Sequence, residues 1–287
     1  LFVCSYDHNV YALNATTGKF MWKYATDGGI AGSPCVTEDR VIIGSDDRVT
    51  YCINAQSGRI AWTCPTQGRV RSSPRAQFGH VFFGSDDRRL YAVNLQNGRV
   101  SWKAELDGSV RSSVAVGEDL LYVGDETGSL YCLDIRGTIK WRYTTKRSIT
   151  SSPVLDPELQ LVVVGSQDGT VYGLDAQSGW VVWRFRTGKA VISSPCVVDG
   201  VAYVGSADNN VYALEAKTGR LVWKYATEGQ VNSSPAVANG ALYVGSIDGA
   251  VYSLDVKTGT IRWRLYTGGA VISSPLIEED TVYIGSN

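Results

Sequence analysis

The stretch that decides the fold is Val191–Tyr225, which reads V-I-S-S-P-C-V-V-D-G-V-A-Y-V-G-S-A-D-N-N-V-Y-A-L-E-A-K-T-G-R-L-V-W-K-Y. Three turn signals, Asp199-Gly200, 207–210 and Thr218-Gly219, divide it into four runs that are rich in β-branched and aromatic residues. The last run alternates at a period of two, as a half-buried strand does. The segment therefore predicts four short antiparallel strands, at 191–198, 201–206, 211–215 and 220–225.

The same unit returns along the whole chain, and a tryptophan marks each copy. Seven tryptophans recur at intervals of 39 to 42 residues, namely Trp22, Trp62, Trp102, Trp141, Trp183, Trp223 and Trp263. Four strands in each repeat of about forty residues are typical of a propeller blade. The sequence therefore predicts an all-β fold, a β-propeller of four-stranded antiparallel blades.

The ends of the chain decide the expected number of blades. The second strand type occurs eight times, because Leu1–Ser5 and Val282–Ser286 both match it, whereas the other three types occur seven times. The resulting 29 strands favour seven blades, with eight as the alternative. We expect residues 1–287 to form a single propeller domain, closed by N- and C-terminal strands that share one blade. Because the chain starts without Met inside a strand-like segment, we also expect it to be a fragment of a longer protein.

Composition narrows the functional classes. The net charge of −1 argues against bulk nucleic-acid binding, which uses a basic surface. No run approaches the roughly 18 apolar residues of a membrane span. The six cysteines include no adjacent pair and no Cys-x-x-Cys. We expect buried, unpaired thiols, which favour a reducing, cytoplasmic compartment.

The repeat resembles a known family. The stretch 207–223, A-D-N-N-V-Y-A-L-E-A-K-T-G-R-L-V-W, resembles the tryptophan-docking motif of pyrroloquinoline-quinone-like (quinoprotein-type) repeats, and the resemblance covers essentially the whole chain. Family members include quinoprotein dehydrogenases, the lipoprotein scaffold of the outer-membrane assembly machine, and sensor propellers of bacterial kinases. The resemblance implies a propeller in which this motif holds neighbouring blades together, and it allows a periplasmic or extracellular location.

The resemblance does not carry the family's redox chemistry onto this chain. The dehydrogenases use adjacent cysteines and long inserted segments that hold calcium, and the chain has no Cys-Cys and nearly constant repeat spacing. Its two histidines, His8 and His80, fall at predicted turns. We therefore predict no catalytic residues, no cofactor and no metal. The function indicated is a non-catalytic binding or scaffold propeller, and the alternative is a quinone-dependent oxidoreductase.

One position of the repeat varies freely and supplies the candidate site. It lies two residues before the inner-strand serine and is occupied in turn by Ala31, Arg71, Arg111, Thr150, Ile192, Asn232 and Ile272. We call it the variable slot, and we expect it near the mouth of the channel, where the first strand begins. Arg69, Arg147 and Lys189 lie two or three residues nearer the loop than the slot residue of the same repeat.

Two interpretations of this rim are open. The rim residues Arg69, Arg71, Arg111, Arg147, Lys189 and Asn232 could bind a protein partner or a small anionic ligand through charge-assisted hydrogen bonds. Alternatively, the arginines pair with the acids of the second turns, Asp46, Asp86, Asp125 and Glu126. Trp180, an eighth tryptophan at a predicted exposed turn, is a further candidate partner contact.

Overall fold

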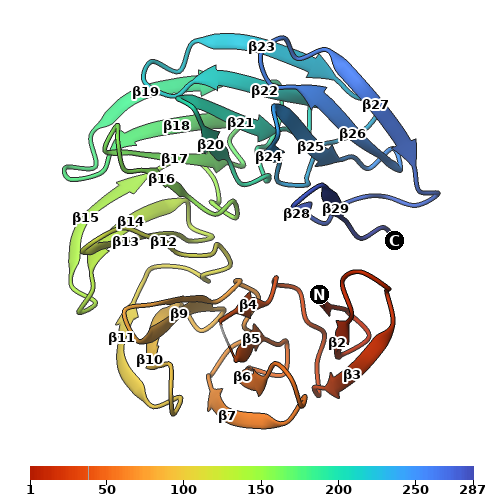
Figure 1. Cartoon of the computed structure of the whole chain (residues 1–287). Coiled ribbons are helices and arrows are strands. Elements are labelled where there is room, and N and C mark those ends of the chain that lie inside the picture. The colour runs from red at the N-terminus through yellow and green to blue at the C-terminus, as the bar shows by residue number, and fades with distance from the viewer. Residues whose placement is uncertain (38) are drawn as a thin grey trace. The chain divides into compact units, whose positions relative to one another are not determined.

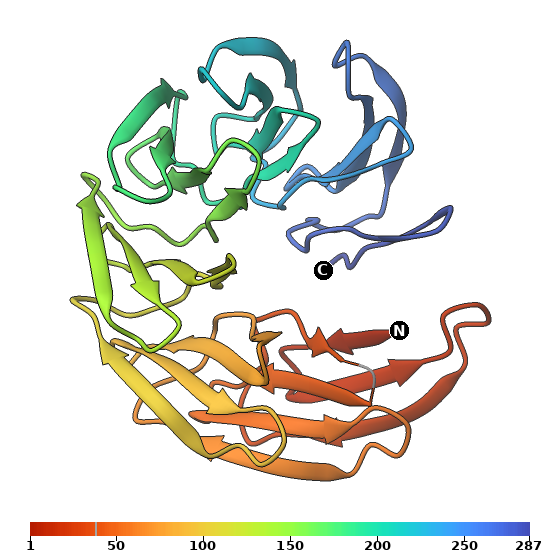
Figure 2. The ribbon, with the colours of Figure 1, turned by 60° about the vertical axis from the view of Figure 1, so that its left-hand side comes forward.

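The computed structural model describes residues 1–37 and 39–287, and it confirms the all-β prediction (Figure 1). Within those residues the chain forms 29 strands, β1 to β29, joined by tight turns. The strands divide between two compact units, Leu1–Lys140 and Trp141–Asn287. Figure 2 shows from a second direction that strands consecutive in the chain lie beside one another within each sheet.

The first unit holds three complete sheets and most of a fourth. The first sheet has the order β1-β2-β3 (Phe2–Cys4, Asn9–Leu13, Phe20–Ala25). The second has the order β4-β5-β6-β7 (Cys35–Val36, Arg40–Gly44, Val49–Asn54, Ile60–Pro65). The third is β8-β9-β10-β11 (Arg75–Gln77, His80–Ser85, Arg89–Asn94, Val100–Glu105). The fourth is β12-β13-β14-β15 (Ala115–Val116, Leu120–Gly124, Ser129–Asp134, Ile139–Thr144), and the unit boundary falls inside β15.

The second unit continues the same pattern. Its first complete sheet is β16-β17-β18-β19 (Val154–Asp156, Leu161–Ser166, Thr170–Asp175, Val181–Arg186). The next is β20-β21-β22-β23 (Cys196–Val198, Val201–Gly205, Asn210–Glu215, Leu221–Ala226). Then follow β24-β25-β26-β27 (Ala236–Ala238, Ala241–Gly245, Ala250–Asp255, Ile261–Tyr266) and the pair β28-β29 (Leu276–Glu278, Thr281–Tyr283). Six four-stranded sheets with one of three and one of two strands, in the part of the chain described, are consistent with seven or eight blades.

The first strand of each sheet is shorter than the sequence predicts. Residues 191–198 were expected to form one strand, but β20 covers only Cys196–Val198. Pro195 has no N–H to donate to a ladder. The Ser194 N–H donates instead to Ser234 Oγ of the next sheet, at 2.9 Å. This segment therefore links neighbouring sheets rather than extending its own.

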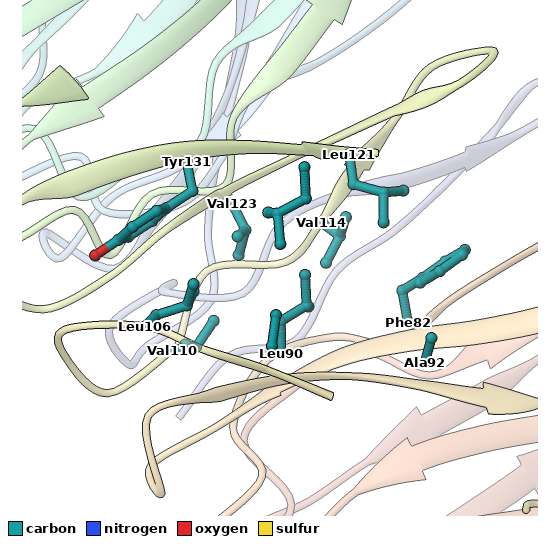
Figure 3. Close-up of a cluster of buried hydrophobic side chains, with 11 residues drawn as sticks. Phe82, Leu90, Ala92, Leu106, Val110, Val114, Leu121, Val123 and Tyr131 are labelled. Carbon is teal, nitrogen blue, oxygen red and sulfur yellow. The ribbon is translucent and has the colours of Figure 1, made fainter. Parts of the chain in front are cut away.

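Neighbouring sheets pack through their side chains. Between the third and fourth sheets, Phe82, Leu90, Leu121 and Val123 are fully buried against one another (Figure 3). Leu121 and Val123 both reach this layer because side chains two residues apart in a strand share one face of the sheet. The core of each unit is thus a series of apolar layers between consecutive sheets.

The tryptophan repeat has the docking role that the resemblance implies. Six indole N–H groups donate to a carbonyl of the following sheet at 2.7–3.0 Å, in the pairs Trp22–Ala55, Trp62–Leu95, Trp102–Ile135, Trp141–Ala176, Trp183–Ala216 and Trp223–Val256. Each ring also lies on the turn glycine of that sheet. At Gly219, which has φ +70°, a Cβ would come within 2.6 Å of Trp183 Cδ2. Only glycine fits both the left-handed backbone and the close approach.

Candidate functional site

At Asn232 the variable slot is held in place by main-chain contacts of the neighbouring residues. The Val231 N–H donates to Ser206 O of the preceding sheet at 3.1 Å, and the Ile247 N–H donates to Gln230 O at 2.9 Å. Val231 packs so closely on Gly205 that a Cβ there would lie 2.6 Å from Val231 O. Asn232 therefore follows a segment fixed between the second turn of the preceding sheet and the second turn of its own sheet.

In the first unit the slot carries Ala31 and two arginines, and the arginines form an ion-pair ladder. Arg71 forms a bidentate pair with Asp46 of the preceding sheet, with both N···O distances at 2.8 Å. Arg111 pairs with Asp86 in the same way, at 2.9 and 3.3 Å, and its Nη1 lies 2.7 Å from Glu126 Oε1. Bidentate pairs of this kind fix the guanidinium in one orientation. The ladder matches the alternative in which these arginines pair with turn acids.

The electrostatics of the ladder follow from this geometry. The bonds from Arg71 lower the pKa of Asp46, and the charges of Arg69 and Arg111 lower it further. The bonds to Asp46 in turn raise the pKa of Arg71. One donor stays available, because Arg71 Nη1 has no hydrogen-bond partner among residues 1–37 and 39–287. Arg69 is exposed and forms no salt bridge within the same residues. The first unit thus presents a mostly neutralised ladder with one unpaired cation beside it.

In the second unit the same positions carry a hydroxyl, two apolar side chains and an amide, and Thr150 Oγ1 accepts from Gln167 Nε2 at 3.2 Å. Ile192 and Ile272 are exposed, and Asn232 stands between them in the chain order of the sheets. The Asn232 Oδ1 atom is buried without a hydrogen-bond partner in the described part of the chain. Arg147 and Lys189 are exposed and form no ion pair there. The structure therefore places Arg69, Arg71 and Arg111 in one unit, and Arg147, Lys189 and Asn232 in the other.

The repeated turn aspartates are structural. Asp208 Oδ1 accepts from Asn210 N at 3.1 Å, while its Oδ2 accepts from Tyr212 Oη at 2.7 Å and from Gly188 N of the preceding sheet at 2.6 Å. One carboxylate thus closes its own turn and holds the neighbouring sheet. Equivalent tyrosine bonds form at Asp7, Asp47, Asp87, Asp168 and Asp248, with lengths of 2.5–2.9 Å. The repeated aspartates therefore cap their turns.

Asp125 is the residue whose role the sequence analysis missed. It was assigned to the rim acids, but it is fully buried. It accepts from Thr127 N at 3.0 Å, Ser129 N at 2.9 Å and Gly108 N at 2.9 Å. The bond from Ser129 N, and a bond from Tyr131 Oη at 3.2 Å, are those that the turn aspartate makes in other sheets, and Thr127 occupies that aspartate's usual position. The signal in the sequence was a paired exchange, Asp-x-Thr where other copies have Ser-x-Asp.

Trp180 lies at an exposed turn, as expected. Its side chain is 79 % exposed, while its carbonyl accepts from Asp175 N at 2.8 Å. The preceding Gly179 lies under the ring of Trp141. The backbone of this turn is therefore fixed, and the indole projects from it into solvent.

The titratable side chains form no metal-binding cluster in the part of the chain that the structure describes. All six cysteines there are free, and burial raises the pKa of Cys132 to about 12. His80 begins β9 rather than lying in the turn, and its Nδ1 is 3.0 Å from Phe78 O. Among the described residues no helix has the length and apolar character needed to cross a membrane.

Comparison with known proteins places the chain in a family. The model of the family described as "Outer membrane protein assembly factor BamB" matches residues 1–113, 97–195 and 167–287. The chain belongs to this family. Among solved structures, BamB from Moraxella catarrhalis is similar, with 17 % identity, a TM-score of 0.85, and coverage of 99 % of this chain and 90 % of that one.

Other members of the fold are equally similar in shape. The computationally designed Ika8 protein has a TM-score of 0.88 at 16 % identity, covering 99 % of this chain and 89 % of the designed one. A europium-containing methanol dehydrogenase has a TM-score of 0.82 at 15 % identity, covering 96 % and 78 %. At these identities the likeness shows the shared fold. The β-alanine-activating enzyme of Danio rerio is 40 % identical over 60 residues, a stretch that covers 21 % of this chain and 5 % of that enzyme.

Proposed function

We propose that residues 1–287 act as a non-catalytic binding or scaffold propeller, which holds a protein partner or a small anionic ligand at the slot residues. Membership of a family described as an outer membrane protein assembly factor supports this role. The observation that carries the proposal is the variable slot. Around it the valine, glycine and serine contacts repeat from sheet to sheet, whereas its own side chains change from arginine to threonine, isoleucine and asparagine.

The cations at the slot provide the chemistry for an anionic group. Arg71 Nη1 and the Arg69 side chain keep donors available beside the ladder, and a carboxylate or phosphate could accept from both. Arg147 and Lys189 offer exposed positive charge in the second unit. Trp180 is a separate contact proposed on its exposure, because tryptophan is enriched at the centres of protein interfaces.

The test compares two double variants of equal charge change. Arg71→Ala with Arg111→Ala removes the slot arginines, whereas Arg59→Ala with Arg99→Ala removes exposed arginines of the third turns. If the partner is a protein, we expect the slot variant to crosslink to fewer proteins than the native chain does in cells that produce it. If the ligand is a small anion, we expect the slot variant to give less heat of binding in titrations with inorganic phosphate and with succinate. The turn variant should behave as the native chain. Unchanged binding by the slot variant would remove the ladder from the proposal.

A quinone-dependent oxidoreductase is the second candidate, because two dehydrogenase structures share the fold. This chain lacks the adjacent cysteines that the resemblance implies for quinoprotein dehydrogenases. Incubation with pyrroloquinoline quinone and calcium, followed by desalting and an absorbance spectrum, separates the two functions. A retained quinone spectrum with dye reduction on added alcohol would favour the oxidoreductase.

A further inference from the structure

One face of the sheet β24-β25-β26-β27 is exposed where the preceding sheet is covered. On this face Tyr243, Ser253 and Trp263 stand opposite one another in register, and Leu265 follows Trp263 by two residues on β27. Residues paired across strands, or two apart in one strand, share a face of the sheet. Trp263 is 42 % exposed and Leu265 is 60 % exposed, whereas Trp223, forty residues earlier, is buried. We call Tyr243, Trp263 and Leu265 the open face.

The equivalent face of the preceding sheet is covered by the third strand and third turn of the sheet that follows it. The Trp223 indole N–H donates to Val256 O at 2.8 Å, and its ring lies on Gly259. Tyr225, two residues later, packs against Tyr252 with ring centroids 5.9 Å apart. The same ring contact forms in the pairs Tyr24–Tyr51, Tyr143–Tyr172 and Phe185–Tyr212. A covered face therefore meets a tyrosine on the third strand and a glycine in the turn after it.

The strands β28 and β29 hold the position of the first two strands of a following sheet. The Asn287 N–H donates to Ala270 O at 3.1 Å, as the Ile247 N–H donates to Gln230 O at 2.9 Å one sheet earlier. β28 also lies beside β24 (Figure 1). Among residues 1–37 and 39–287, β29 pairs with β28 alone, whereas β25 pairs with strands on both sides. One edge of β29 is therefore free, next to the open face.

A main-chain donor at the same end of the sheet also lacks its usual acceptor. The Gly188 N–H donates to Asp208 Oδ2 of the following sheet at 2.6 Å. The Glu228 N–H donates to Asp248 Oδ2 in the same way, at 3.0 Å. The Gly268 N–H is at the equivalent position and has no acceptor in the part of the chain that the structure describes. The missing acceptor is a carboxylate placed just before a third strand.

We propose that the open face and the free edge of β29 bind a β-hairpin of a partner polypeptide, of the kind that the third and fourth strands form in the six complete sheets. Its first strand adds to β29 and places an aromatic residue against Leu265. Its turn places a glycine under the Trp263 ring and a carbonyl that accepts from the indole N–H. A carboxylate before its first strand accepts from the Gly268 N–H.

This surface goes beyond the proposed function, because it uses none of the slot residues and lies within the second unit alone. A strand that adds to a free edge gains main-chain hydrogen bonds, while contacts of its side chains select its sequence. Here the selecting contacts are those that the chain already makes between its own consecutive sheets, so the chemistry of the partner follows from them.

The test uses a synthetic peptide with the sequence of residues 208–226, which contains the aspartate, tyrosine and glycine of the repeat at the required spacing. The peptide is titrated calorimetrically against the intact 287-residue chain, Trp263→Ala and Trp180→Ala. Trp180 is an exposed tryptophan of another sheet in the same unit, so its variant controls for the loss of an indole. Trp263→Ala should raise Kd about tenfold or more, and Trp180→Ala should leave Kd unchanged.

A second arm changes the peptide and leaves the protein native, so that its result does not depend on how a variant folds. Gly219→Val in the peptide should raise Kd for the native chain about tenfold or more, because a side chain at this position meets the docked indole. Against Trp263→Ala the same peptide change should cause little further loss. Lys217→Ala in the peptide alters an exposed residue of the same turn and should leave Kd unchanged.

Three outcomes would overturn the inference. The first is that the native chain does not bind the peptide, and the second is that the native chain and Trp263→Ala bind it with equal Kd. The third comes from sedimentation of the chain without peptide. Self-association that rises with concentration and is lost in Trp263→Ala would place a second copy of the chain on the open face instead of a partner hairpin.

Discussion

Replacing Trp183 by alanine should remove the contact that joins two neighbouring sheets of the second unit. The Trp183 indole is 7 % exposed, packs with Val191, Val204 and Leu214, and donates to Ala216 O at 2.7 Å. A tryptophan buries about 150–250 Å². At about 25 cal/mol per Å², this burial contributes roughly 4–6 kcal/mol as an upper bound. Measured Trp→Ala changes suggest a loss of about 3–5 kcal/mol in the free energy of unfolding.

Trp263 is the matched control, because it holds the same register position on β27. It is 42 % exposed, and its indole N–H has no acceptor in the part of the chain described. Trp263→Ala should therefore cost only about 1–2 kcal/mol, from its partial burial beside Tyr243. Urea unfolding followed by circular dichroism measures both values. Equal losses for the two variants would show that docking on the next sheet contributes nothing, and the reasoning would be refuted.

Three further changes follow from the same contacts. Gly219→Ala should lower the free energy of unfolding by about 2 kcal/mol or more, since φ is +70° and the new Cβ meets the docked indole; urea unfolding measures it. Arg71→Ala should weaken the fall in the free energy of unfolding that acid causes. The pKa of Asp46 is lowered in the fold, so the Asp46 carboxylate contributes its full stabilisation above its unfolded pKa of about 3.9 and loses it as pH falls through the lower folded pKa. Urea unfolding midpoints between about pH 5 and pH 2 measure this change. Asp125→Ser alone should cost about 2 kcal/mol by leaving buried donors unpaired, whereas adding Thr127→Asp should restore most of it, and additive losses in that double-mutant cycle would contradict the exchange of roles.

The repeating parts of the fold could be predicted from sequence because residues close together in the chain determine them. Tyr212 and Trp223 recur at one register in every copy, and a residue kept in all copies marks a packing role. Turn glycines such as Gly219 are fixed by backbone conformation, which is also local. The 29 strands could therefore be predicted from the sequence, and the docking of the tryptophans from the family resemblance of the repeat.

The sequence offered the turn acids as partners of the slot arginines but did not decide which acid pairs with which arginine, because the partner lies in the preceding sheet. Arg71 pairs with Asp46, 25 residues earlier, and no local rule selects that carboxylate over Asp86. Asp125 was misassigned for a related reason. A residue count across the turn places it with the rim acids, whereas its carboxylate turns inward to replace the missing aspartate at Thr127.

The constancy around the slot explains why its side chain is free to change. At Ile192 and Asn232 the chain is held by Val191 and Val231, whose N–H groups donate to the preceding sheet at 3.0 and 3.1 Å. The glycine under Val231 and the serine two residues after Asn232 supply the other contacts, and none of them involves the slot side chain. At these two positions a substitution alters surface chemistry while the main-chain contacts between sheets stay intact, whereas at Arg71 it also removes the pair with Asp46 of the preceding sheet. The same backbone can therefore carry a charged ladder in one unit and exposed isoleucines in the other. At Ile192 and Asn232 the proposed binding function can therefore be tested by substitution with little change in the main-chain contacts that join the sheets.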